Sequence, residues 1–248
     1  MKNKYFEKLL LLLAIEYNCD PSDFLKKENV ITESRFDDRS RRYSDQKHFF
    51  HMVTTGKNAV ITADPVLHPF LYQFSKDKCG HFLFEFKNIL PLDGELKKHG
   101  YTLSDTFHMF LPEKRVEMQK DLDVRFFCDK EILPFYEMKC FPNAILESFS
   151  EKRPDKMVVC AYDGKKIMGM AGCSEDACGW MQIGIDVFPE YRSMGVGSYL
   201  VNILKNKIED MGDIPFYGTS ISNYHSWNIA LNCGFYPAWL EVGAVKVK

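Results

Sequence analysis

The feature that most constrains the fold is the segment of residues 181–212, where a strand pattern gives way to a helical one. β-Branched residues occupy alternate positions at its start, as in a half-buried strand: Ile183, Ile185 and Val187. Pro189 has no amide hydrogen for a β-ladder, so the strand ends before it. Beyond it, apolar residues recur four apart: Val196, Leu200, Leu204 and Ile208. This spacing predicts an amphipathic helix with one face toward a core.

The turn between this strand and this helix contains an arginine and two glycines. The first N–H groups of a helix have no internal partner and lie at the positive end of its dipole. Gly195 and Gly197 remove the Cβ atoms that would keep a ligand away, and Arg192 adds a guanidinium suited to phosphate oxygens. The sequence therefore predicts a diphosphate site at the helix start. A glycine-containing turn with an exposed arginine and no ligand is the alternative.

Two standard nucleotide motifs are excluded at this turn. No lysine follows either glycine, as the Walker pattern requires, and Leu200 replaces the third glycine of GxGxxG. The remaining pattern, RxxGxG between a strand and a helix, resembles the acyl-CoA pyrophosphate loop of the GNAT superfamily of N-acyltransferases. A second segment, residues 215–239, resembles the last strand and helix of that superfamily, with Asn223 preceding Gly234 and Phe235 at the usual spacing. Within the superfamily, the two segments look like the subgroup that includes the zwittermicin-resistance acetyltransferase.

The resemblance covers residues 122–247 and implies a GNAT fold: an α/β (α+β) domain with a mixed, mostly antiparallel sheet flanked by helices. We expect this domain to span 113–248 and an N-terminal α/β domain to span 1–112. Both halves contain a helix, a glycine, an aromatic residue and a strand in that order, at Gly100-Tyr101 and Gly234-Phe235. The first half is therefore interpreted as a degenerate GNAT-like unit on the acceptor side, although this sequence of elements is also a common connection.

Other elements are predicted from local patterns. In the first half we expect helices at the leucine-rich N-terminus and at 65–74 and 92–99, with strands at 30–32, 49–53, 59–62, 81–86 and 101–111. In the second half we expect a strand at 123–128, a largely helical stretch at 130–149, and a hairpin of 157–162 with 167–172 around an Asp-Gly turn.

The resemblance also implies roles for particular residues. The backbone of Ile185, Asp186 and Val187 would pair with the pantetheine amides, and Asn223 would bind near the pantetheine or the acyl end. The pyrophosphate would be held by the loop: Arg192, Ser193, Met194, Gly195, Val196, Gly197 and Ser198.

The catalytic groups stay open at the level of sequence. Many superfamily members place a proton-donating tyrosine seven residues after the asparagine, where this chain has Ala230. Tyr217, Tyr224 and Ser226 are alternative donors, and unaided departure of a thiolate whose thiol has a pKa of about 8.5 is also tolerable. Asp186 is the nearest carboxylate for a general base, but alternation along the strand favours a solvated or structural role.

Composition excludes several classes of function. A net charge of −2 argues against nucleic acid as a partner. The eight cysteines are scattered without a CxxC pair, and the six histidines of the first half lack ligand spacing, so we expect reduced thiols and no metal. The leucine run at 9–13 is too short to span a membrane, and no export signal is evident, so we expect a cytoplasmic protein.

The resemblance thus implies an acetyltransferase that moves an acetyl group from acetyl-CoA, its co-substrate, to an amine by direct attack. The acceptor, expected to be a small molecule, and the oligomeric state are not specified by sequence. A non-catalytic acyl-CoA-binding sensor or scaffold module is the alternative, because Ala230 and the missing base leave the catalytic groups unassigned.

Overall fold

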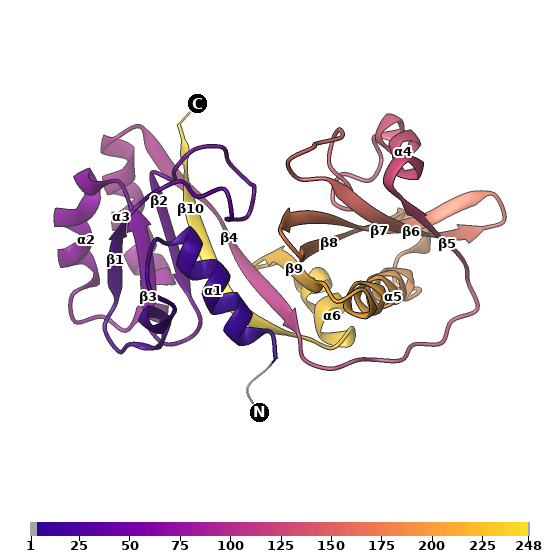
Figure 1. Ribbon diagram of the computed structural model, residues 1–248, viewed down its shortest axis with the longest axis horizontal. Coiled ribbons are helices and arrows are strands. Elements are labelled where there is room, and N and C mark those ends of the chain that lie inside the picture. Colours follow the sequence, from indigo (N-terminus) through magenta and orange to yellow (C-terminus); the bar gives the residue numbers. More distant parts are fainter. Residues whose placement is uncertain (1–3, 248) are drawn as a thin grey trace. The chain divides into compact units, whose positions relative to one another are not determined.

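The computed structural model describes residues 4–247 and divides into two compact units (Figure 1). The first comprises Met1–Met109 with Pro237–Lys248, and the second comprises Phe110–Tyr236. The division falls inside two strands, β4 (Tyr101–Pro112) and β10 (Phe235–Lys246), which both pass from one unit into the other. It therefore differs from the expected domains 1–112 and 113–248. The end of β10 pairs with β2 of the first unit, from Leu240 opposite Thr54 to Gly243 opposite His51.

Among the described residues, the first unit contains three α-helices and all or part of five strands of the sheet. The strand order is β1-β3-β2-β10-β4, in which β1–β3 is parallel and β2–β3 and β2–β10 are antiparallel. The strands that lie wholly in this unit are β1 (Val30–Glu33), β2 (Phe50–Thr54) and β3 (Ala59–Ala63). The helices are α1 (Phe6–Glu16), η1 (Pro21–Leu25), η2 (Pro65–Leu67), α2 (His68–Ser75), η3 (Gly80–Phe84) and α3 (Phe86–Lys98). The predicted hairpin of β2 and β3 is confirmed.

The prediction of a strand at residues 81–86 is wrong. Residues 81–86 form η3 and the start of α3, because the amides of Phe82 and Glu85 donate to carbonyls three residues earlier rather than to a neighbouring strand. The aromatic residues that suggested a strand are largely exposed here, with Phe82 at 52% and Phe86 at 77%. Helix α3 begins six residues before the predicted start at Leu92 and continues through Pro91, with Asn88, Leu92 and Leu96 buried.

The second unit is a mixed sheet with helices on both faces, which confirms the predicted fold class. The strand order is β9-β8-β7-β6-β5, and all pairs are antiparallel except β8–β9. The strands are β5 (Asp123–Cys128), β6 (Asp155–Asp163), β7 (Lys166–Ala177), β8 (Trp180–Val187) and β9 (Ile214–Ser220). The helices are η4 (Asp129–Ile132), α4 (Leu133–Met138), η5 (Pro189–Tyr191), α5 (Val196–Asp210) and α6 (Tyr224–Asn232).

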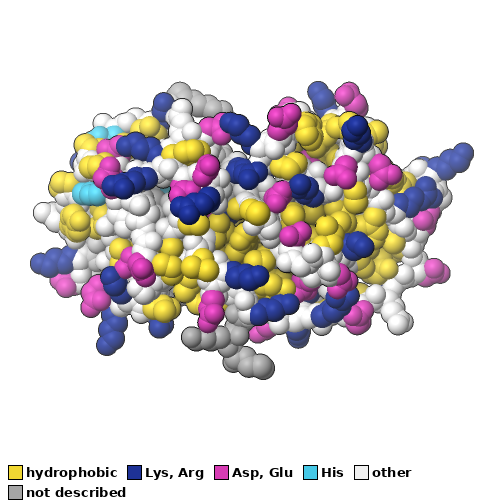
Figure 2. Space-filling view, viewed as in Figure 1, with side chains coloured by type: hydrophobic (Ala, Val, Ile, Leu, Met, Phe, Trp, Pro, Cys, Tyr) yellow, Lys and Arg dark blue, Asp and Glu magenta, His cyan; other side chains and the backbone are white. Residues whose placement is uncertain are grey.

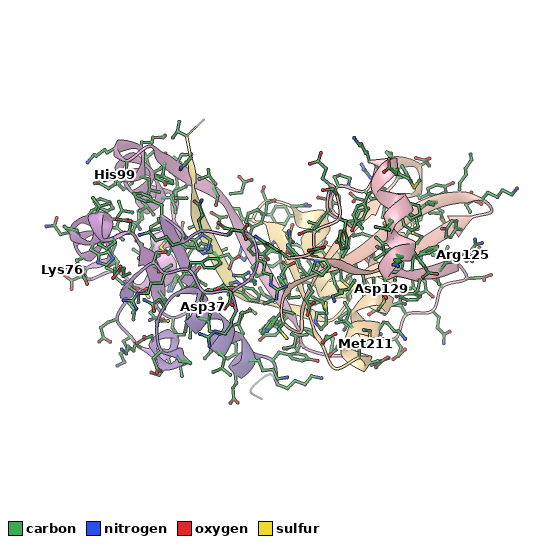
Figure 3. The ribbon with its side chains drawn as sticks, turned by 45° about the horizontal axis from the view of Figure 1, so that its top comes forward. Asp37, Lys76, His99, Arg125, Asp129 and Met211 are labelled. Atoms are coloured by element: carbon green, nitrogen blue, oxygen red, sulfur yellow. The ribbon has the colours of Figure 1, made fainter. Side chains whose placement is uncertain are left out.

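Helices α5 and α6 cover one face of this sheet and α4 lies over the other (Figure 1). The predicted stripe of α5 is confirmed, because Val196, Leu200, Leu204 and Ile208 are all buried in the core beneath it. Met211, labelled in Figure 3, follows the last turn of this helix. A smaller core that includes Ile132, Phe135 and Phe141 lies on the α4 face.

The largely helical stretch predicted at 130–149 is mostly not helical. Helix α4 ends at Met138, and Lys139 adopts a left-handed conformation with φ of 51°. The chain then crosses the face of β7 and β8 at the point where Gly172 and Gly184 lie opposite each other in the two strands. A Cβ atom at Gly184 would lie 1.7 Å from the carbonyl oxygen of Asn143. Only glycine allows the segment to pass this close to the sheet, and the contact fixes an irregular path.

Charged residues of both signs are interspersed over the face shown in Figure 2, and no basic stripe is visible there. No helix among residues 4–247 has the length and apolar character needed to cross a bilayer.

Candidate functional site

The two parallel strands of the second unit separate along their length. β8 and β9 are paired from Trp180 opposite Ile214 to Ile183 opposite Tyr217, and the pairing stops there. β8 nevertheless continues to Val187 and β9 to Ser220. The backbone of β8 beyond Ile183 therefore has an edge that β9 does not cover.

The orientation of this edge follows from the pairing on the other side of β8. The amide of Phe188 donates to the carbonyl of Met168 on the β7 side, at 3.0 Å. Because bonded directions alternate along an antiparallel strand, the N–H and C=O groups of Ile185 and Val187 point to the opposite edge. This places the backbone of two predicted cofactor-binding residues where an extended ligand can pair with it.

The start of α5 lacks a side-chain cap. The N-cap residue is Gly195, and no described side chain accepts a hydrogen bond from the first turn. Within the described residues 4–247, the amides from Met194 to Ser198 have no acceptor, whereas the amide of Tyr199 donates to the Gly195 carbonyl at 3.1 Å. Unpaired N–H groups at the positive end of a 15-residue helix are suited to binding an anion.

Glycine is needed at the two positions of this turn for different physical reasons. Gly195 has φ of +74°, in the left-handed region that favours glycine. A Cβ atom at Gly197 would instead lie 3.3 Å from Ile229 Cδ1 and 3.4 Å from Val187 Cγ2. Gly197 therefore serves the packing of α5 against α6 and β8. The sequence interpretation, in which both glycines clear space for a ligand, stays a prediction.

Two cations lie near the loop. The exposed Arg192 donates from Nε to the carbonyl of Val187 at 3.1 Å, which fixes its position at the end of β8. Lys120 donates from Nζ to the carbonyl of Met194, and its Nζ would lie 3.0 Å from a Cβ atom at Gly195. No salt bridge to a carboxylate involves either cation in the described part of the chain. Sequence reasoning missed Lys120, which lies 74 residues before Met194 without a motif.

Asp186 has a structural position. Its carboxylate accepts hydrogen bonds from the amide and side chain of Asn143, at 2.8 and 2.6 Å, and from the amide of Ala144, at 2.9 Å. These three bonds hold the segment that crosses Gly172 and Gly184. Its side chain is directed at that segment, on the sheet face opposite the one that α5 and α6 cover.

The candidate proton donors lie at the start of α6 and at the point where the strands separate. Tyr217, whose backbone forms the last β8–β9 pair, has its hydroxyl 2.6 Å from Ser226 Oγ. Burial raises the pKa of Tyr217 to about 12, so this phenol stays protonated at neutral pH. Tyr224 is 73% exposed, and Asn223 caps α6 by accepting from the Ser226 amide at 3.1 Å.

The position at which the resemblance implies a tyrosine is not open to solvent in this chain. Ala230 is fully buried in the core between α6 and the sheet. Neighbouring aromatic side chains fill that core, with Phe110 in edge contact with both Trp227, at 4.9 Å between ring centroids, and Tyr217, at 6.4 Å. Tyr217 belongs to the same core as Ala230, and its hydroxyl is hydrogen-bonded to Ser226.

The family of this segment is indicated by comparison with known sequences. Residues 116–235 match the model of the Acetyltransferase (GNAT) family. The match spans a little under half of the chain and lies entirely in the second unit. It covers β8, the RxxGxG loop, α5, β9 and α6. No curated protein sequence matches significantly.

Solved structures give weaker similarities. A putative GNAT acetyltransferase from Novosphingobium aromaticivorans is 13% identical over 60% of this chain and 69% of its own, with a TM-score of 0.47. A Drosophila protein is 11% identical over 84% of this chain and 78% of its own, with a TM-score of 0.48. A putative streptothricin acetyltransferase from Bacillus anthracis, in complex with acetyl coenzyme A, is 17% identical over 38% and 64%, with a TM-score of 0.31. All three TM-scores lie below 0.5, so the function of the chain is inferred from the family match and the site geometry.

Among residues 4–247, no group of three or more His, Cys, Asp or Glu side chains is arranged to hold a metal ion.

Proposed function

We propose that the second unit binds acetyl-CoA and transfers its acetyl group to an amine. The observation that carries this proposal is the combination of an uncapped helix start with an uncovered strand edge beside it. The first feature suits a diphosphate and the second an extended chain bearing amides. Coenzyme A contains both in series, and the GNAT family match covers both features.

The proposed roles of the residues follow from these positions. Amides of Met194 to Ser198 would hold the diphosphate, with Arg192 close to the loop's entry. The backbone N–H and C=O of Ile185 and the N–H of Val187 would pair with pantetheine amides, because the Val187 carbonyl already accepts from Arg192. The Asn223 side-chain amide has its N–H groups left for the pantetheine or the acyl end. Asp186 and Ser193 then contribute through the strand and loop backbone.

The chemistry needs little from side chains. The amine nitrogen attacks the thioester carbonyl carbon, so that a C–N bond forms and the C–S bond breaks. The electron pair leaves with sulfur, and the nitrogen loses one proton. A backbone amide at the uncovered edge of β8 would stabilise the oxyanion. The Tyr217–Ser226 pair is the proposed donor to the departing thiolate, and the amine proton would leave through water because Asp186 is held by three hydrogen bonds.

We propose a small-molecule acceptor, an acceptor-side role for a degenerate GNAT-like first unit, a cytoplasmic protein, and membership of the subgroup that includes the zwittermicin-resistance acetyltransferase. The RxxGxG loop and the Asn223 to Phe235 spacing support the last of these.

The test is turnover with acetyl-CoA and a panel of primary amines. Coenzyme A should be quantified by chromatography and the acetylated amine by mass spectrometry, because eight cysteines would react with a thiol reagent. Release of coenzyme A together with a product 42 Da heavier than one amine is the expected outcome, since acetylation replaces one hydrogen with an acetyl group. Absence of coenzyme A binding to the wild-type protein would refute the proposal.

The second candidate is a non-catalytic acyl-CoA sensor, favoured by the closed position at Ala230. The same assay separates the two functions. Tight binding of acetyl-CoA with no release over a broad panel supports the sensor, and turnover with any one acceptor excludes it.

A further inference from the structure

We propose that Lys120 is a binding residue for the coenzyme diphosphate, delivered to the loop by a strap that runs along α5. The strap is the segment of residues 113–120, between β4 and β5. The inference rests on the proposed function, because it assigns a further residue to the same anion site. It adds a side chain from outside the RxxGxG loop.

Polar side chains of α5 hold the strap by its backbone. Asn202 and Asn206 both donate to the carbonyl of Val116, at 3.0 and 3.2 Å. Lys205 donates to the carbonyls of Lys114 and Cys233, both at 2.8 Å. The Lys205 side chain is fully buried, and desolvation lowers its pKa. Burying a lysine and two asparagines for these bonds is costly unless the bonds are made, so the strap has a defined path.

The contacts give the strap a direction. Its Arg115 forms an ion pair with Asp210 at the C-terminal end of α5, at 2.6 Å. Val116 follows in contact with the middle of the helix, and Lys120 reaches Met194, just before the N-terminal end. The strap therefore spans α5 from end to end and brings Lys120 to the uncapped amides.

The electrostatics of this position favour an anion. The ammonium of Lys120 lies beside the positive end of a helix, next to five amides with no acceptor among the described residues and close to a loop that already contains Arg192. A cation at a helix N-terminus is unfavourable, whereas an anion there is stabilised. A diphosphate on the amides would turn this repulsion into attraction, and Lys120 would contact it as a point charge.

The test compares Lys120→Met with Lys207→Met, which removes the same charge from an exposed position near the far end of α5. Dissociation constants should be measured by calorimetry for coenzyme A, dephospho-coenzyme A and pantetheine. Lys120→Met should raise the first two by about tenfold and leave pantetheine unchanged, as loss of one charged hydrogen bond predicts. The difference should shrink at high salt, and Lys120→Arg should retain most of the affinity.

Two results would overturn this inference while leaving the proposed function intact. One is unchanged affinity of Lys120→Met for coenzyme A. The other is a loss for coenzyme A without a loss for dephospho-coenzyme A, because Lys120 would then bind the 3′-phosphate. Failure of the wild-type protein to bind coenzyme A would instead remove the proposed function itself. Lys120 is exposed, so the variant is expected to fold, and its circular dichroism spectrum checks this.

Discussion

Replacement of Arg41 should destabilise the first unit in a strongly pH-dependent way. Its guanidinium is buried between two carboxylates, with side-chain exposures of 1% for Arg41, 5% for Glu16 and 9% for Glu241. The side chain makes two hydrogen bonds to each carboxylate, between 2.7 and 3.0 Å. Glu241 also accepts from Trp239 Nε1 at 2.7 Å. Arg41→Met would remove the positive charge and leave two carboxylates facing each other in the core.

The expected loss of stability follows from the least costly way in which the variant can avoid two buried negative charges. Breaking a buried ion pair by removing one partner costs about 3–5 kcal/mol. One glutamate can avoid ionisation by binding a proton, which costs about 4 kcal/mol at pH 7 and about 1 kcal/mol at pH 5 for an ordinary pKa near 4.3. We therefore expect a loss of about 4 kcal/mol at pH 7 that shrinks by about 2–3 kcal/mol at pH 5.

The pH dependence of stability has opposite signs in the wild type and in Arg41→Met. In the wild type, Arg41 lowers the pKa of Glu241, so its contribution to stability is present above the pKa of the unfolded state and lost as pH falls through the folded value. In Arg41→Met, the remaining carboxylates should have raised pKa values, because burial and mutual repulsion disfavour their charges. The folded variant then binds more protons than the unfolded one, and its stability falls as pH rises.

The assay is urea unfolding at pH 5, 6 and 7, combined with hydrogen exchange of the amides in α1 and β10 to localise the effect in the first unit. The matched control adds Glu16→Gln and Glu241→Gln to Arg41→Met, which removes all three charges. This variant should be less sensitive to pH and should recover part of the lost stability. A loss below about 1 kcal/mol at pH 7, or an equal loss at pH 5 and 7, would refute the reasoning.

Three shorter predictions concern the second unit. Gly195→Ala should weaken coenzyme A binding about tenfold or more, by straining the left-handed turn and crowding the anion site, whereas Gly212→Ala, also at positive φ, should not; calorimetry on both variants is the measurement. Asp186→Asn should lower the free energy of unfolding by about 1–3 kcal/mol without shifting the pH–rate profile, and a shifted profile would instead identify a base. Ala230→Tyr should overpack the core and cost about 1–3 kcal/mol without faster turnover; a stable, faster variant would contradict the closed position.

The elements predicted most accurately are those whose hydrophobic periodicity lies within a single strand or helix. The alternation in β8 and the four-residue repeat of α5 each arise from one core-facing side, so both elements are visible without knowledge of their neighbours. The loop between them was predicted for the same reason, because the missing cap of Gly195 and the chemistry of Arg192 are properties of adjacent residues.

Features that depend on distant partners were missed. The stretch 130–149 has apolar residues that suggest a helix, but its path is set by close contact with the backbone at Gly172 and Gly184. The strap has no periodicity, since its carbonyls accept from α5 and its side chains need follow no pattern. The passage of β10 into the first unit depends on pairing with β2, about 190 residues earlier in the chain.

Strand β8 shows how one short sequence can serve three needs through alternation. The odd-numbered Ile185 and Val187 turn their side chains to the core under α5 and their backbone groups to the uncovered edge. The even-numbered Gly184 and Asp186 face the other side, where the glycine admits the crossing segment and the carboxylate fixes it. Because side chains alternate with a period of two, a shift of the strand by one residue would bury Asp186 in the core and turn Ile185 and Val187 toward the crossing segment. The residues that anchor the crossing segment therefore also set the register of the edge on which cofactor binding is proposed to depend.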